Sequence, residues 1–100
     1  MTIEKTENGK EITIAPIGRL DTTTALQFGE AIIASLDGTE KMILDFQDLE
    51  SLSSAGLRVL LSAHKVFMKR GRGELVIRHV NDTINEVFEA TGFLDILNIE

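Results

Sequence analysis

The chain contains no cysteine, so it can form neither a disulfide nor a metal site with thiolate ligands. It also lacks tryptophan and tyrosine and has only two histidines and five phenylalanines, which leaves little material for base-stacking surfaces or a metal site. No apolar run approaches the roughly 20 residues that a membrane-spanning helix needs, and the polar first ten residues do not form a secretion signal. We therefore expect a cytoplasmic protein with no bound metal, no cofactor and no membrane insertion.

The net charge is −6, because 16 aspartate and glutamate residues outnumber 10 lysine and arginine residues. A negative chain is a poor partner for the phosphate backbone of nucleic acids, so nucleic-acid binding is not expected. The charge favours a protein partner with a basic or neutral docking surface. One hundred residues with 43% hydrophobic content are enough for one core, and we expect a single domain over residues 1–100.

Residues 2–6 and 11–17 have the alternation of two strands with one solvated face. Asn8-Gly9 between them predicts a tight hairpin, because both central positions of the favoured turn need a positive φ. Pro16 has no N–H to donate, so the second strand is expected to end there or to lie at a sheet edge.

A helix is expected next, with Asp21 as its N-cap and Gly38 as its end. Its buried face would consist of apolar and small residues spaced three and four apart, namely Ala25, Leu26, Gly29, Ile32, Ile33 and Leu36. A glycine inside a helix costs about 1 kcal/mol relative to alanine, so Gly29 predicts close packing on the sheet.

The centre of the chain reads as an apolar strand from Met42 to Phe46, a polar loop, and a helix that begins after Ser53 and ends near Arg70. Ser53 can cap this helix by accepting a bond from a free backbone N–H. Two helix faces are expected: a polar stripe of Ser54, Arg58, Ser62, Lys65 and Lys69, and an inner side of Leu57, Leu60, Leu61, His64, Phe67 and Met68. Ser54 therefore lies on the solvated face, near the positive end of the helix dipole.

A strand over residues 74–80 and a third helix complete the pattern, with Asn81 or Asp82 as the N-cap of that helix and Gly92 as its end. Its inward positions would be Ile84, Val87, Phe88 and Thr91. Residues 93–99 form either a last strand or a packed tail. Because strand–helix–strand passages imply crossovers between parallel strands, the fold class is α/β: a mixed sheet of four or five strands, with about three helices packed mainly on one face.

The residues alone do not indicate an enzyme. No acid pair, Ser–His–Asp set, metal-ligand spacing or phosphate-binding loop is visible. The candidate residues also have simpler interpretations: a Ser-Ser pair before a helix usually only caps it, Asp21 is equally a plain N-cap, and Arg58 is equally an ordinary surface residue.

The segment from Leu44 to Leu61, LDFQDLESLSSAGLRVLL, resembles the signature of the STAS domain, in the branch of bacterial anti-sigma factor antagonists. Residues 18–21, GRLD, and residues 86–93 resemble the family's motifs before its first helix and at its third. In the family, the phosphorylated serine directly precedes a small residue and a glycine, a position held here by Ser54. Many members have aspartate where this chain has Ser53, so Ser53 is the alternative phosphorylation site.

The resemblance implies a regulator and not an enzyme. The unphosphorylated chain would bind an anti-sigma factor, itself a serine kinase of the GHKL ATPase fold, and thereby release a sigma factor. Phosphorylation of Ser54 would end the binding, and a metal-dependent serine phosphatase would restore it. The expected partner-binding residues are Asp21, Ser53, Ser54, Gly56 and Arg58. The alternative is a STAS subunit that is not phosphorylated and has a structural role in a larger complex, such as a lipid-transport ABC system.

Overall fold

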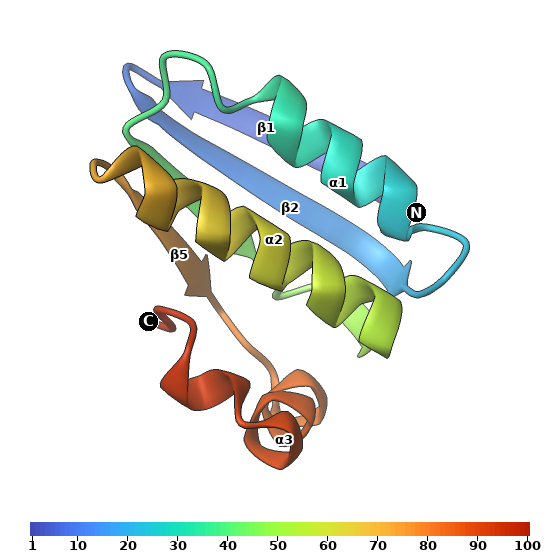
Figure 1. The fold of residues 1–100 in the computed structure, drawn as a ribbon. Coiled ribbons are helices and arrows are strands. Elements are labelled where there is room, and N and C mark those ends of the chain that lie inside the picture. Colours follow the sequence, from blue (N-terminus) through green and yellow to red (C-terminus); the bar gives the residue numbers. More distant parts are fainter.

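A computed structural model describes residues 1–100 and contains five strands and three α-helices (Figure 1). The elements in order are β1 (Thr2–Asn8), β2 (Glu11–Leu20), α1 (Ala25–Ala34), β3 (Lys41–Asp45), β4 (Leu49–Leu52), α2 (Ser54–Arg70), β5 (Glu74–Arg78) and α3 (Asp82–Thr91). A short 3-10 helix, Phe93–Asp95, follows α3. No helix combines the length and the apolar character that crossing a membrane requires.

The hairpin between β1 and β2 is confirmed, but its turn lies one residue later than predicted. Asn8 pairs with Glu11 in the antiparallel ladder, so the two loop residues are Gly9 and Lys10. Gly9 has φ +64, whereas Asn8 and Lys10 are not in the positive-φ region. A hairpin turn with positive φ at its first central position needs glycine only there, which explains why asparagine is not used in the turn.

The sheet has the order β1-β2-β3-β5, and β4 pairs with the last part of β2. The β2–β3, β2–β4 and β3–β5 pairs are parallel, so the expected mixed sheet is confirmed. Pro16 neither ends β2 nor lies on an edge strand, and that prediction was wrong. Pro16 lies between the segment of β2 that pairs with β3 (residues 11–14) and the segment that pairs with β4 (residues 18–20). Pro16 pairs with Ile3 of β1, and no residue of β3 or β4 pairs with it on the other side of the strand.

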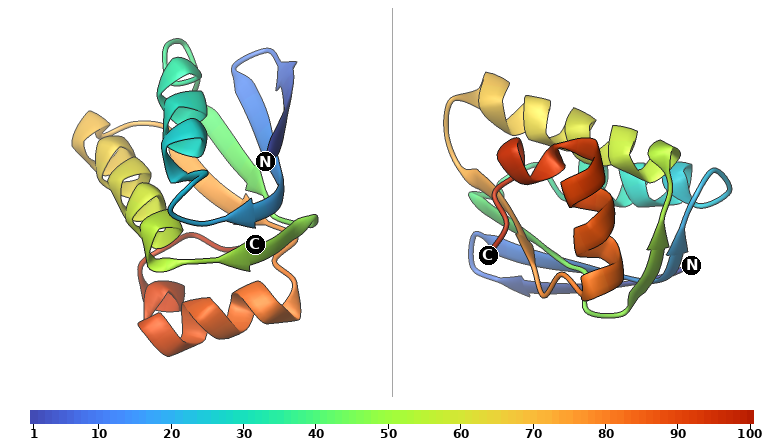
Figure 2. Two further views of the ribbon diagram at one scale, coloured as in Figure 1. Left: turned by 90° about the vertical axis from the view of Figure 1, so that its right-hand side faces the viewer. Right: turned by 90° about the horizontal axis from the view of Figure 1, so that it is seen from below.

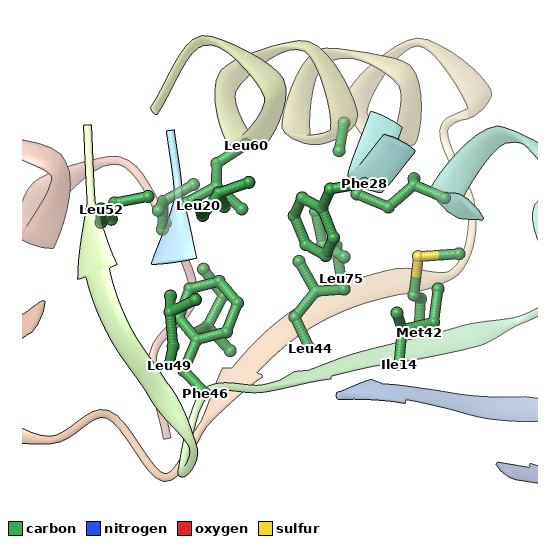
Figure 3. Close-up of a cluster of buried hydrophobic side chains, with 14 of the residues drawn as sticks. Ile14, Leu20, Phe28, Met42, Leu44, Phe46, Leu49, Leu52, Leu60 and Leu75 are labelled. Carbon is green, nitrogen blue, oxygen red and sulfur yellow. The ribbon is translucent and has the colours of Figure 1, made fainter. Parts of the chain in front are cut away.

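Helices α1 and α2 lie side by side on one face of the sheet, and α3 closes the end next to β4 (Figures 1 and 2). Phe46 directly follows β3 and lies close to aromatic rings of two helices. Its ring centroid lies 6.4 Å from that of Phe28 on α1 and 6.4 Å from that of Phe88 on α3. Figure 3 shows Leu20, Leu49 and Leu52 from the ends of β2 and β4 gathered below Leu60 of α2. One continuous core therefore supports both the sheet and the start of α2.

The buried face of α1 differs from the predicted one. Phe28 and Ile32 are buried, whereas Leu26 and Ile33 are 74% and 68% exposed. The apolar residues of α1 form too wide a stripe for the sequence to define its centre, and the sheet contacts the Phe28 side. Gly38 does not end the helix, which stops at Ala34; Gly38 has φ +76 in the turn that follows.

The predicted polar stripe of α2 is exposed along its whole length. Met68 was placed on the inner side but is 67% exposed, and Thr91 of α3 is exposed rather than inward, with its hydroxyl bonded to the Val87 carbonyl at 2.7 Å. Residues 96–100 form a packed tail: Ile99 bridges Ile77 and so covers the outer edge of β5.

Candidate functional site

The predicted site residues gather where β2 and β4 end. Leu20 of β2 pairs with Leu52 of β4, and the Ser53 N–H donates to the Leu20 carbonyl at 2.9 Å. Ser53 is extended, with φ −93 and ψ 174, and α2 begins at the next residue. The expected proximity of the Ser53-Ser54 segment to the Asp21 end of β2 is therefore present. β4, which provides this contact, was predicted as a loop; four residues are too few to show a strand pattern in the sequence.

Gly56 allows the first turn of α2 to approach the strands closely. A Cβ atom at this position would lie 2.6 Å from Leu52 Cδ1 and 2.7 Å from Leu20 Cγ, well inside van der Waals contact. Gly56 is buried and, as a glycine, has no side chain that could contact a partner. Its role is to seat the start of the helix against the sheet.

The two candidate serines have opposite environments. The Ser53 hydroxyl is shielded from solvent and has no hydrogen-bond partner, so the predicted side-chain cap does not form. Ser54 is exposed at the first position of the helix. A modifying enzyme can reach the Ser54 hydroxyl, whereas the Ser53 hydroxyl is available only if the start of the helix moves.

The start of α2 is electrostatically open to an anion. Its first turn contains no acidic residue, and the first N–H groups of a helix have no intrahelical acceptor. These groups and the helix dipole place partial positive charge at the N-terminus. Arg58, one turn further along, is exposed on the same face as Ser54. An anionic group on Ser54 would therefore be favoured here.

Asp21 is not the N-cap of α1, which is Thr24. Its carboxylate accepts bonds from the Thr23 N–H at 3.0 Å and from the Thr23 hydroxyl at 2.7 Å, and its backbone carbonyl accepts from the Ala25 N–H at 2.9 Å. The two bonds from Thr23, followed by those from Thr24, lower the pKa of the Asp21 carboxyl below its ordinary value of 3.8. Asp21 therefore orders the turn between β2 and α1 and stays ionised at neutral pH.

Two further cavities were not apparent from the sequence. An apolar groove of about 440 Å³ runs between α1 and α2, with Thr22 and Arg58 at the end near Ser54. A larger hollow of about 640 Å³ lies at the opposite end of the molecule and is lined by charged side chains, including the ion pairs Lys10–Glu40 and Lys41–Glu74. Gly29, expected to pack on the sheet, faces Val59 of α2 in the groove. No group of three or more His, Cys, Asp or Glu side chains is arranged to hold a metal ion.

Comparison with known proteins identifies relatives over the whole chain. BtrV of Bordetella bronchiseptica, named as an anti-sigma factor antagonist, is 36% identical over 83 residues, which are 82% of this chain and 71% of BtrV. The anti-sigma-B factor antagonist of Staphylococcus aureus is 27% identical over 100 residues, which are 99% of this chain and 92% of that protein.

Solved structures share the fold at lower identity. A Thermotoga maritima protein described as an anti-sigma factor antagonist superposes with a TM-score of 0.89 at 21% identity, covering 97% of this chain and 84% of that one. The anti-sigma factor antagonist SpoIIAA in its unphosphorylated form has a TM-score of 0.81 at 16% identity, covering 99% and 88% of the two chains. SpoIIAA of Bacillus is also known in its phosphorylated form, with a TM-score of 0.74 at 16% identity, covering 99% and 91%.

The family model of the STAS domain matches residues 2–100. Together with the relatives in Bordetella and Staphylococcus, this match shows that the chain belongs to the STAS domain family, among the anti-sigma factor antagonists.

Proposed function

We propose that this protein is an anti-sigma factor antagonist controlled by phosphorylation of Ser54. The unphosphorylated chain binds an anti-sigma factor that is itself a serine kinase of the GHKL ATPase fold, and a sigma factor is released. The observation that carries the proposal is the pair of serines: Ser54 is exposed at the start of α2, while the Ser53 hydroxyl is shielded. The curated relatives of the chain are named for the same antagonist role.

In this proposal the chain is the substrate of the phosphorylation reaction, and the kinase is its catalyst. The kinase transfers the γ-phosphoryl group of ATP to Ser54: the bond from Oγ to phosphorus forms, the bond from phosphorus to the ADP oxygen breaks, and the hydroxyl proton is released. The new group carries about −1.5 to −2 charges and three acceptor oxygens. The N–H groups at the start of α2 and the Arg58 guanidinium on the same face can compensate it.

We expect phosphorylation to lower the affinity for the partner more than it changes the stability of the folded chain. Because Ser54 is exposed, the phosphate needs no repacking of the core. A partner docked over Ser54 would have to bury the phosphate, and an uncompensated buried charge costs about 3–5 kcal/mol, which is on the order of a hundredfold or more in affinity. A metal-dependent serine phosphatase hydrolyses the phosphate and restores binding. Both phosphorylation states are known for SpoIIAA, which has the same fold.

Incubation with the anti-sigma kinases of the source organism and Mg·ATP, followed by intact mass and peptide mapping, tests the proposal. One phosphate should be added to the wild type and to Ser53→Ala, and none to Ser54→Ala. In titrations with the kinase, Ser54→Ala should bind as tightly as the unmodified chain, and Ser54→Asp about a hundredfold more weakly. Equal affinities of the two Ser54 variants, or a chain that no kinase modifies, would instead favour a structural STAS subunit.

A further inference from the structure

Helix α2 is a basic element in an acidic protein. Its 17 residues include Arg58, Lys65, Lys69 and Arg70 and no acid, although the whole chain has a net charge of −6. Arg58, Lys65 and Lys69 are exposed and spaced by seven and four, so they lie on one stripe of the helix. The helix dipole explains basic residues in the last turn, Lys69 and Arg70, but not Arg58 and Lys65.

The apolar groove lies alongside this stripe. Its walls include Ile33 of α1 and Val59 and Val66 of α2, and the small residues Gly29 and Ala63 contribute to its depth. Ile33 is 68% exposed and Val66 is 37% exposed. Both helices lie on the outside of the molecule and no other segment covers them (Figure 2). The molecule therefore presents a groove with apolar walls and one basic rim.

We propose that this groove binds an acidic amphipathic helix of a protein partner. The wall formed by Ala55 to Val66 is about 16 Å long at the rise of an α-helix, or three turns. That length suits a helix that inserts apolar side chains at every third or fourth position. Carboxylates on the flank of this helix that faces α2 would reach Arg58, Lys65 and Lys69. The α1 helix carries a single charged residue, Glu30, so the preference for acid comes from α2.

Two other occupants fit less well. A bilayer surface is flat and cannot fill a concave groove between two helices, although basic and apolar side chains together do favour anionic lipid. A second copy of this chain would pack the same patch against itself in a symmetric dimer, which would bring the two basic stripes together.

The groove ends beside the proposed switch, because Arg58 lies both at the end of the groove and one turn after Ser54. A phosphate on Ser54 would compete with a carboxylate of the bound helix for Arg58. This link depends on the proposed function; binding to the groove itself does not.

A synthetic helical peptide tests the groove without any kinase. The probe has leucines along one face and glutamates along one flank, and its control has lysine in place of each glutamate. Fluorescence anisotropy with the unmodified full chain should show the acidic peptide binding at least about tenfold more tightly than the basic one, with the difference reduced by salt. Lys65→Glu should weaken binding severalfold, whereas Lys5→Glu on β1 should leave it unchanged.

Matched apolar variants locate the contact. Val66→Asp places a charge in the groove and should abolish binding, whereas Leu26→Asp changes an apolar residue that is 74% exposed but outside the groove, and should not. Circular dichroism checks that both variants fold. The inference fails if both peptides bind equally or not at all, if Val66→Asp still binds, or if anionic phosphatidylserine vesicles bind the chain and displace the acidic peptide. None of these outcomes bears on phosphorylation of Ser54.

Discussion

Helices α2 and α3 both begin after an extended N-cap residue, with φ −93 and ψ 174 at Ser53 and φ −79 and ψ 171 at Asn81. In α3 the Asn81 side chain accepts the Ile84 N–H at 2.9 Å, and Asp82 adds a negative charge to the first turn. In α2 the cap residue makes no such bond, and the first turn has no acid. The start of α3 therefore already has a side-chain cap and a negative charge. The start of α2 has neither, and a phosphate on Ser54 would supply the negative charge.

The largest expected effects on stability concern the third residue of each helix. Ile84 of α3 is fully buried, and Ile84→Ala should lower the free energy of unfolding by about 2–5 kcal/mol. Gly56 of α2 has no room for a methyl group, and Gly56→Ala should lower it by about 1–3 kcal/mol. Urea unfolding measures both changes. If Gly56→Ala were as stable as the wild type, the close approach of α2 to β2 and β4 would not limit this position.

Gly29→Ala is the matched control for Gly56→Ala. Its new Cβ would lie 3.7 Å from Val59 Cγ1, an ordinary contact. Since alanine favours helix over glycine by about 1 kcal/mol, this variant should be more stable than the wild type by up to that amount. Glycine-to-alanine substitution should thus raise the free energy of unfolding in α1 and lower it in α2.

Replacing the two N-cap residues by alanine should change the free energy of unfolding by amounts that differ by about 1 kcal/mol. Asn81→Ala removes a bonded cap and should lower the free energy of unfolding by about 0.5–2 kcal/mol. Ser53→Ala removes a shielded hydroxyl that has no partner, so stability should stay unchanged or rise by up to about 1 kcal/mol. A loss after Ser53→Ala as large as that after Asn81→Ala would show that Ser53 does cap α2 in solution.

Charge in the first turn should have a smaller effect. Ser54→Asp gives α2 the acid that α3 already has and should raise the free energy of unfolding by about 0.3–1 kcal/mol at low salt, while Asp82→Asn should lower it by a similar amount. Ser62→Asp, at an exposed position in the middle of α2, should give no comparable gain. Thermal unfolding at low and high salt measures these differences; a gain from Ser54→Asp that salt did not reduce would argue against a dipole effect.

The start of α1 is a third case, in which Asp21 organises the turn with its own carboxylate. Hydrogen bonds from Thr23 hold the folded-state pKa of Asp21 below its ordinary value of 3.8. Its contribution to stability is therefore complete above the unfolded-state pKa and is lost as the pH falls through the lower folded-state pKa. Asp21→Asn should lack this part of the acid dependence in an acid titration followed by circular dichroism. An unchanged acid profile would mean that the turn does not depend on the ionised carboxylate.

Local chemistry explains which predictions were confirmed. The hairpin between β1 and β2, the Asn81 cap and the end of α3 at Gly92, which has φ +79, each depend on a few neighbouring residues. The side-chain cap at Ser53, the N-cap at Asp21 and the helix end at Gly38 were also local predictions, and they were wrong. Two other wrong predictions concern distant contacts. Pro16 is accepted inside a central strand because β3 and β4 leave a gap beside it, and the buried side of α1 depends on where the sheet lies.

The sequence by itself determined that a pair of serines precedes an amphipathic helix after a buried strand, with a glycine two residues after Ser54, because these features depend on residue type and spacing along one segment. Only the tertiary structure decided which of the two hydroxyls is accessible. The backbone N–H of Ser53 donates to the carbonyl of Leu20, a residue 33 positions earlier in the chain. The Ser53 hydroxyl is shielded from solvent in this position. The apolar groove likewise exists only because α1 and α2 pack side by side, and neither helix alone defines it.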